Sequence, residues 1–172
     1  MDLVSAAGLV FQTWMNNTPY YPNALCSPDS DLYAPLNALP EPRLWATMER
    51  LLTFNGTHQF IACRPDRPKE RYTIDFSTDD CLDYVPQFRI GCGIADGGIF
   101  RPNWSIGLND GQLIFLQYVD GRRTIREIAA CVAQSDAVDE GDTVDLQQFA
   151  CELVHSLWRL DFLAMGLGAS TS

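Results

Sequence analysis

The most constraining part of this chain is residues 102–128, because it carries two helix-start signals in close succession. Asn109 is followed three residues later by Gln112, and Thr124 is followed three residues later by Glu127. In such capping boxes the first side chain accepts a hydrogen bond from the amide of the later residue, whose side chain accepts one in return. The spacing predicts two short helices, one that begins after Asn109 and one over residues 125–134.

The residues around these starts extend the pattern. Residues 104–108 are a short, apolar, β-prone run, which predicts a strand before the first helix. Asp120 and Gly121 are expected to end that helix, since glycine adopts the left-handed conformation at little cost. Residues 144–163 predict a third helix, because apolar side chains recur there at steps of three and four residues. These side chains are Leu146, Phe149, Leu153, Leu157 and Leu160.

Two upstream stretches predict the rest of a sheet. Residues 88–94 are expected to be a strand and residues 99–108 one or two strands, with hairpin chemistry at the intervening Asp96-Gly97-Gly98 turn. A long acidic loop over residues 135–143 precedes the third helix. The predicted fold class is α+β, with a winged helix-turn-helix domain of three strands and three helices at residues 86–172. A smaller α/β region precedes it at residues 1–85.

The N-terminal region has a different pattern. Apolar residues between positions 3 and 14 follow helical spacing and predict a packed helix, closed by Asn16, Asn17 and Pro19. Six prolines between positions 18 and 42 predict an extended segment. Pro42 then starts a helix expected over residues 43–53. We also expect a hairpin of residues 59–63 with 71–76, and a short turn or helix at 79–84.

The charge balance argues against nucleic-acid binding. The chain has 22 acidic and 12 basic residues, a formal net charge of −10, whereas phosphate attraction needs a basic face. The basic residues are scattered apart from two short groups at 64–71 and 122–126, and the helix expected at 125–134 is mostly apolar. An acidic surface instead suits basic peptides or a complementary protein, although acidity by itself mainly favours solubility.

The hydropathy pattern predicts no membrane association. No apolar run reaches the roughly 18 residues that a membrane-spanning helix needs. The first residues lack the basic segment of a signal peptide. We therefore expect a cytoplasmic protein.

Cysteines and histidines are too scattered to predict a metal site. The chain has six cysteines, none with C-x-x-C spacing, and two histidines, His58 and His155. Because a chain of this length forms a core without disulfides, we expect free thiols. Nothing in the sequence around Cys63 activates it for catalysis with His58. We predict no catalytic residue and no metal ligand in this chain.

In order and spacing, the elements of residues 86–165 resemble PqqD and related recognition elements. These domains bind precursor peptides during the maturation of ribosomally made natural products. The shared pattern is a proline, a short strand ending in Leu-Asn, an acidic residue, an apolar helix, Asp-Gly and Thr-x-x-Glu-Ile. The matching positions here are Pro102, residues 104–108, Asn109, Asp110, residues 113–118, Asp120, Gly121 and residues 124–128. Gly111 departs from the pattern, since a better helix former is usual there.

The layout of the whole chain resembles the small partner subunits of multinuclear non-haem iron-dependent oxidases, such as those of methanobactin and thiaglutamate pathways. In those complexes the iron lies entirely in the large subunit. The resemblance implies a non-catalytic accessory subunit that forms a heterodimer with an oxidase and presents a precursor peptide to it. It implies no cofactor in this chain, iron in the partner enzyme, and a partner-docking role for residues 1–85.

The resemblance also implies a peptide-binding site. The peptide is expected to add as an extra strand to the sheet edge and to lie against the third helix. The implied contact residues are Trp104, Ser105, Ile106, Gly107 and Leu108 on the strand, and Gln148, Glu152 and His155 on the helix. A proline at Ile106 is expected to weaken binding by removing an amide donor from that edge.

Two other functions remain open. A similar Asp-Gly helical domain occurs as a regulatory C-terminal module of methyltransferase-like proteins, although no glycine-rich cofactor loop follows a strand here. The chain could also be an independent enzyme of another type. An iron-binding partner encoded nearby, a cofactor-binding domain in the same parent chain, or turnover by the purified chain would distinguish the three.

Overall fold

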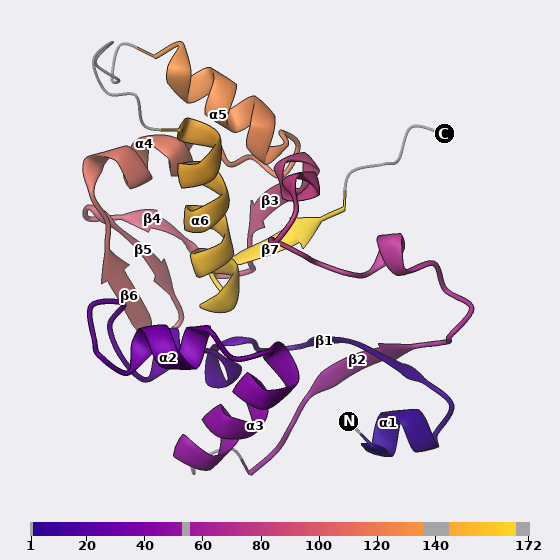
Figure 1. Ribbon diagram of the computed structural model, residues 1–172. Helices are drawn as coiled ribbons and strands as arrows, with labels where there is room; N and C mark the ends of the chain where they lie inside the picture. Colours follow the sequence, from indigo (N-terminus) through magenta and orange to yellow (C-terminus); the bar gives the residue numbers. More distant parts are fainter. Residues whose placement is uncertain (1, 53–55, 136–144, 168–172) are drawn as a thin grey trace. The chain divides into compact units, whose positions relative to one another are not determined.

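The computed structural model describes residues 2–52, 56–135 and 145–167 (Figure 1). Within these residues the chain is mixed α and β, with helices α1–α6 and seven short strands in three antiparallel sheets. The chain divides into two compact units. Unit 1 is Met1–Thr73 with Arg159–Asp161, and unit 2 is Ile74–Trp158 with Phe162–Ser172. The sequence had suggested residue 85, rather than Thr73, as the end of the first domain.

Unit 1 is built around a two-stranded sheet and a cluster of aromatic side chains. Its elements are α1 (Asp2–Ala6), β1 (Val10–Trp14), the 3-10 helices η1 (Thr18–Tyr20) and η2 (Pro22–Ala24), α2 (Tyr33–Asn37), α3 (Glu41–Leu51), β2 (Phe60–Cys63) and the 3-10 helix η3 (Lys69–Arg71). The ring of Trp14 on β1 stacks on Tyr20, with centroids 3.8 Å apart, and meets Trp45 of α3 edge-on. The helix expected at 43–53 is confirmed as α3, on which Leu44 and Met48 are buried. Its expected end at Thr53 lies outside the described residues.

The prediction of an N-terminal helix over residues 3–14 is correct only as far as Ala6. Helix α1 ends at Ala6, because Gly8 takes a positive φ of 69° and turns the chain. The apolar residues that follow form strand β1, which pairs with β2 with Phe11 opposite Ala62. A distant strand therefore decides the conformation of this segment, against its local helical spacing.

Two other expectations for unit 1 are also wrong. The proline-rich stretch is not extended, since η1, η2 and α2 lie within it and Pro35 sits inside α2. Residues 71–76 do not pair with β2. Instead, the Arg67 guanidinium donates to the Arg71 carbonyl and lies over the Tyr72 ring. The start of this segment is therefore fixed by side-chain contacts and not by pairing with a strand.

In its described residues, unit 2 has two sheets and three helices of eight or more residues. Its elements are the 3-10 helix η4 (Asp79–Asp83), β3 (Val85–Phe88), β4 (Gly93–Ala95), β5 (Gly98–Arg101), β6 (Trp104–Gly107), α4 (Asp110–Gln117), α5 (Ile125–Ala133), α6 (Leu146–Arg159) and β7 (Leu163–Gly166). The short helix expected at 79–84 is confirmed as η4, and the third helix is confirmed as α6. The acidic loop predicted before α6 lies almost entirely outside the described residues.

The three-stranded sheet of unit 2 has the order β4-β5-β6. The turn between β4 and β5 is made by Asp96 and Gly97, both with positive φ, as the hairpin chemistry predicted. The turn between β5 and β6 is made by Pro102 and Asn103, and Asn103 supplies the positive φ. Residues 88–94 are not one strand, because Gly91 takes a φ of 81° between β3 and β4.

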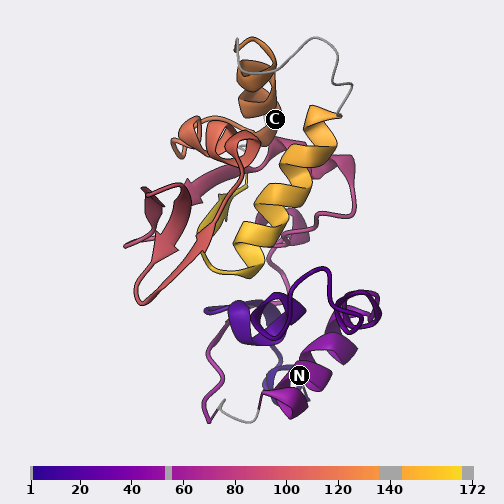
Figure 2. The ribbon, with the colours of Figure 1, turned by 90° about the vertical axis from the view of Figure 1, so that its left-hand side faces the viewer.

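The core of unit 2 lies where α6 packs beside the sheet and the two shorter helices (Figure 2). Ala150, Val154 and Leu157 of α6 are buried, as are Ile125 and Ile128 of α5. Strand β7 leaves α6 and pairs with β3 to form the second sheet of the unit. None of the helices in the described part of the chain is both long enough and apolar enough to cross a membrane.

Candidate functional site

Both predicted capping boxes are present, and the first fixes the path of the chain from β6 into α4. Asn109 Oδ1 accepts the Gln112 amide at 2.9 Å, and Gln112 Oε1 accepts the Asn109 amide at 3.0 Å. At the start of α5, Thr124 Oγ1 accepts the Glu127 amide at 3.2 Å and Glu127 Oε2 accepts the Thr124 amide at 2.8 Å. Each pair satisfies two backbone donors that a helix start would otherwise leave to water.

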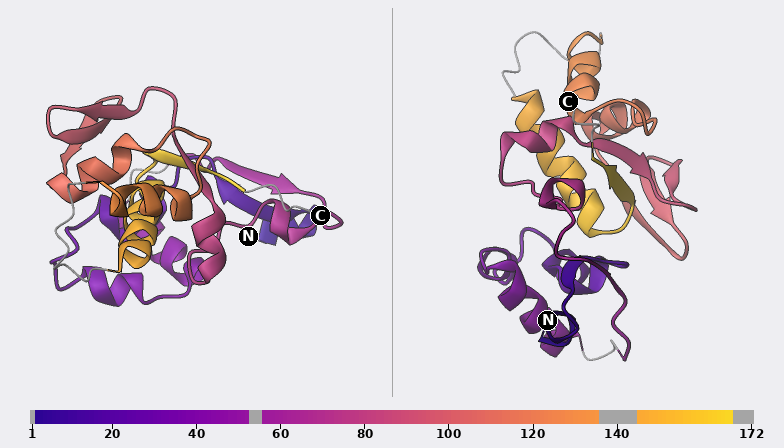
Figure 3. Two further views of the ribbon diagram at one scale, coloured as in Figure 1. Left: turned by 90° about the horizontal axis from the view of Figure 1, so that it is seen from above. Right: turned by 90° about the vertical axis from the view of Figure 1, so that its right-hand side faces the viewer.

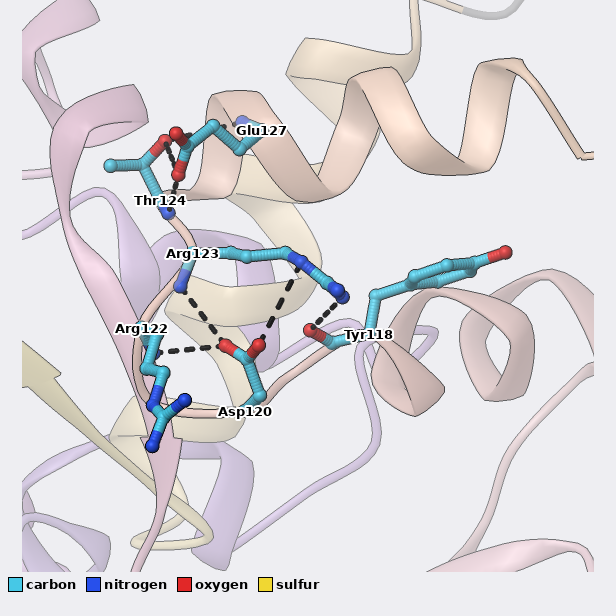
Figure 4. A network of polar contacts seen from close by, with 6 residues as sticks. All are labelled: Tyr118, Asp120, Arg122, Arg123, Thr124 and Glu127. Carbon is cyan, nitrogen blue, oxygen red and sulfur yellow. Dashed lines mark hydrogen bonds and ion pairs between the residues drawn. The ribbon is translucent and has the colours of Figure 1, made fainter.

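The loop between α4 and α5 is organised by Asp120 (Figure 4). Its Oδ1 accepts the amides of Arg122 at 2.9 Å and Arg123 at 3.0 Å, and its Oδ2 lies 3.7 Å from the Arg123 guanidinium. The Arg123 amide, and then the Arg122 amide, hold the pKa of Asp120 below its ordinary value. Helix α4 ends at Gln117, a few residues before the expected stop at Asp120 and Gly121, so Asp120 orders the loop that follows. Gly121 takes the expected left-handed conformation, with a φ of 73°.

The predicted strand β6 is an edge strand of its sheet. It pairs with β5 on one side, with Ile106 opposite Ile99 and Ser105 opposite Phe100, and no described strand pairs with its other side. The Leu108 amide donates to the Gly97 carbonyl at 3.1 Å. Because hydrogen-bonded and non-hydrogen-bonded pairs alternate in an antiparallel ladder, this bond fixes the direction of every amide along β6.

In this register the backbone groups of Trp104 and Ile106 face β5. Those of Ser105 and Gly107 face the open edge. The expectation that the Ile106 amide is a free edge donor is therefore wrong, since it lies inside the sheet. The Ile106 carbonyl likewise points at β5, since its oxygen would clash with a Cβ added to Gly98. An added strand would therefore form its hydrogen bonds with the backbone groups of Ser105 and Gly107.

The side chains of β6 divide between its two faces. Trp104 and Ile106 lie on the core side and are half-buried, as is Leu108, whereas Ser105 and Gly107 are exposed. The Trp104 ring stacks on Phe162 with centroids 5.3 Å apart, and the Arg101 guanidinium carbon lies 4.6 Å from the Trp104 centroid. Arg101 was not among the predicted site residues, although its position across the short turn from Trp104 was a usable signal.

The three candidate residues on α6 occupy one side of the helix. Gln148 and Glu152 are exposed and joined by a hydrogen bond of 2.9 Å. His155 is half-buried and stacks on Phe76, with centroids 4.5 Å apart and planes within 12°. Phe76 belongs to the segment that leads into η4, so this side of α6 is turned toward η4.

A different side of α6 is turned toward α4, which directly follows β6. Phe149 meets Phe115 of α4 edge-on, with ring centroids 6.5 Å apart. Seen from two directions, α6 lies between the three-stranded sheet and η4 (Figures 1 and 3). The structure therefore gathers the candidate residues into two groups, one along β6 and one on the part of α6 beside η4.

The residues considered for metal binding or catalysis have other surroundings. His58 lies in unit 1 between the Tyr20 hydroxyl, 2.6 Å from Nδ1, and the Glu49 carboxylate, 3.2 Å from Nε2. Across the ranges that the structure describes, no three or more His, Cys, Asp and Glu side chains are grouped so that they could hold a metal ion. No protein-family model matches the chain.

Proposed function

We propose that this chain is an accessory subunit that binds a ribosomally made precursor peptide by strand addition at β6. In this proposal unit 2 is a winged-helix recognition element of the PqqD type, and the chain presents the peptide to an iron-dependent oxidase in a heterodimer. The observation that carries the proposal is the open edge of β6, with backbone groups of Ser105 and Gly107 facing outward. The order of three antiparallel strands and then α4, α5 and α6 supports it.

The physical basis of binding would be backbone hydrogen bonding. An unpaired strand edge presents donors and acceptors to any extended peptide of suitable register. Affinity would come from the ladder to Ser105 and Gly107. Specificity would come from the peptide side chains that face the Trp104 and Ile106 side of the sheet, where alternate residues meet the core-side surface.

The chemistry of the complex would lie in the partner. Holding a peptide next to a reactive centre turns an encounter between two molecules into a reaction within one complex. This chain would supply the position of the peptide, and the oxidase would supply the iron and the oxidation. The chain alone is then expected to bind the peptide and to modify nothing.

Co-expression with the genes that neighbour its own gene tests the proposal. The chain carries an affinity tag, and mass spectrometry identifies what co-purifies while the iron content of the complex is measured. We expect a large iron-containing protein and a short peptide. A folded chain that retains neither, or one that turns over a substrate alone, would overturn the proposal. Retention of a methyltransferase would favour the regulatory-module function instead.

A titration of the co-purified peptide into the isotopically labelled chain tests the site itself. The amide resonances of Ser105 and Gly107 should shift on binding, because each gains a hydrogen-bond partner in the added strand. Those of Trp104 and Ile106, already bonded to β5, should shift less. The largest changes at η4 or in unit 1 would place the peptide elsewhere.

A further inference from the structure

Two thiols of unit 2 that the proposed peptide site does not use lie side by side. Cys81 is buried on η4, and Cys151 is half-buried on α6. Their sulfur atoms are 2.6 Å apart. A disulfide bond is about 2.05 Å long, so the two atoms need to approach by only about half an ångström to form one.

Contacts on both sides of Cys81 hold η4 against its neighbours. Before it in the chain, Phe76 stacks on His155 of α6. After it, the Asp83 carboxylate accepts from the Arg126 guanidinium of α5 at 3.3 Å. The two sulfur atoms are therefore brought together by the packing of η4 on two helices, in addition to their own contact.

The sulfur pair can be reached by a small reagent. Both cysteines line a cavity of about 600 Å³, which Phe76, Leu82 and the polar residues Asp79, Gln147 and Gln148 also line. Asp79, Gln147 and Gln148 are exposed, so the cavity has a polar margin open to solvent. A small organic disulfide can approach Cys151 from this margin.

We propose that Cys81 and Cys151 are a reversible dithiol–disulfide pair, oxidised by exchange with a low-molecular-weight disulfide, that covalently joins η4 to α6. One cysteine, as its thiolate, attacks the small disulfide, forms a mixed disulfide and releases the first small thiol. The other cysteine loses its proton, attacks the protein sulfur of that mixed disulfide and releases the second small thiol. Two protein thiols are oxidised and one small disulfide is reduced to two thiols, which take up the two protons.

The surroundings of Cys151 lower the reactivity of its thiol. Burial, followed by the hydrogen bond to Cys81 and the charge of that neighbour, raises the pKa of Cys151 to about 12. Because the attacking form is the thiolate, attack by Cys151 at neutral pH is slow. The inference does not depend on peptide binding.

Peptide mapping of the full chain tests the pair directly. The reduced protein is incubated with bis(2-hydroxyethyl) disulfide, its remaining thiols are alkylated, and it is digested with trypsin without reduction. We expect a link between peptide 72–89, which holds Cys81, and peptide 127–159, which holds Cys151. Because Cys131 also lies in the second peptide, the Cys131→Ser variant is the matched control and should retain the link. Dithiothreitol should remove it.

Thermal unfolding gives a second readout. The oxidised protein should unfold at a higher temperature than the reduced one, because the link closes a long chain loop in the unfolded state. In Cys151→Ser, which changes a half-buried side chain, the oxidant should produce no such increase. The proposal is overturned if Cys81 and Cys151 are both recovered alkylated while other cysteines are oxidised, or if Cys151→Ser keeps the full increase.

Discussion

Thr124 shows how much a single side chain contributes to the start of a helix. Its hydroxyl accepts the Glu127 amide, so Thr124→Ala removes one half of a capping box. We expect the variant to lose about 1 kcal/mol of unfolding free energy, the usual cost of losing such a cap. Urea denaturation followed by circular dichroism measures the loss. Thr124→Ser keeps a hydroxyl and should behave like the wild type; equal stability of all three proteins would contradict the assigned role.

Asp120 should make stability depend on pH in the acidic range. Its folded pKa lies below the unfolded value, so its contribution is present above the unfolded pKa and disappears as the pH falls through the folded pKa. Asp120→Asn should therefore be less stable than the wild type at pH 7, and the difference should shrink as the pH falls below the unfolded pKa of the carboxyl group. Thermal unfolding at a series of pH values measures this.

Arg123→Gln is the matched control for this pH dependence. It keeps the Arg123 amide, which is the largest cause of the shift, and removes only the guanidinium charge. Most of the pH dependence should remain in this variant. If it is abolished there, the ion pair and not the backbone amides would be its main cause.

At the scale of elements, β6 allows a test that separates edge amides from ladder amides. Ser105→Pro removes an amide that faces the open edge, a position at which a strand tolerates proline. We expect peptide binding to weaken about fivefold, since one backbone hydrogen bond contributes roughly 1 kcal/mol and about 1.4 kcal/mol corresponds to a factor of ten. Calorimetric titration with the co-purified peptide measures it.

Two substitutions complete this test. Ser105→Ala keeps the amide and should bind like the wild type. Ile106→Pro removes an amide bonded to β5, so it should disturb the sheet itself, visible as lower unfolding stability. Unchanged affinity of a folded Ser105→Pro variant would mean that the peptide does not add at this edge.

The elements that sequence predicts best are those whose signals are local. Both capping boxes and the Asp96-Gly97 turn depend on residues within a few positions of each other, and all three are present. The prediction of a helix at residues 10–14 was wrong because this segment pairs with β2, far along the chain. Local sequence spacing carries no information about such distant pairing. Gly8 and Gly91 were usable signals, since each takes the positive φ that interrupts an expected element.

The candidate site was predictable to the same degree. The residues of β6 follow from a local run of sequence, so the strand was found. Which side of α6 faces which neighbour depends on tertiary packing, and the stacking of His155 on Phe76 could not be read from helical spacing. The contact of Cys81 with Cys151 was missed for the same reason, because 70 residues separate the two thiols.

At the scale of the whole molecule, unit 1 is not a continuous piece of the chain. It includes Arg159–Asp161 from the end of α6. The Arg159 guanidinium carbon lies 4.6 Å from the centroid of the Tyr21 ring. The buried carboxylate of Asp161 accepts the Asn17 amide at 2.9 Å, and the Thr18 amide at 2.8 Å and hydroxyl at 2.6 Å. Unit 1 therefore depends on residues that are synthesised late.

We therefore predict that a substitution at Asp161 destabilises the backbone near Asn17 and Thr18, close to the N-terminus. Asp161→Ala removes the carboxylate that accepts hydrogen bonds from groups about 144 residues earlier in the chain. It also places alanine at a φ of 62°, a left-handed conformation that alanine adopts only at a cost. We expect a loss of about 1–3 kcal/mol, the usual cost of leaving a buried hydrogen-bonding group unsatisfied. In hydrogen-exchange mass spectrometry, peptides spanning Asn17 and Thr18 should exchange faster, whereas those of α5 should not.

Two further variants separate backbone strain from the lost hydrogen bonds. Asp161→Gly removes the strain of the left-handed backbone but does not restore the acceptors. Asp161→Asn keeps one acceptor oxygen, and asparagine tolerates this backbone conformation. Because the hydrogen bonds are the main contribution, Asp161→Gly should resemble Asp161→Ala, and Asp161→Asn should lie closest to the wild type. Faster exchange throughout α5 in Asp161→Ala would instead mean that the two units unfold together.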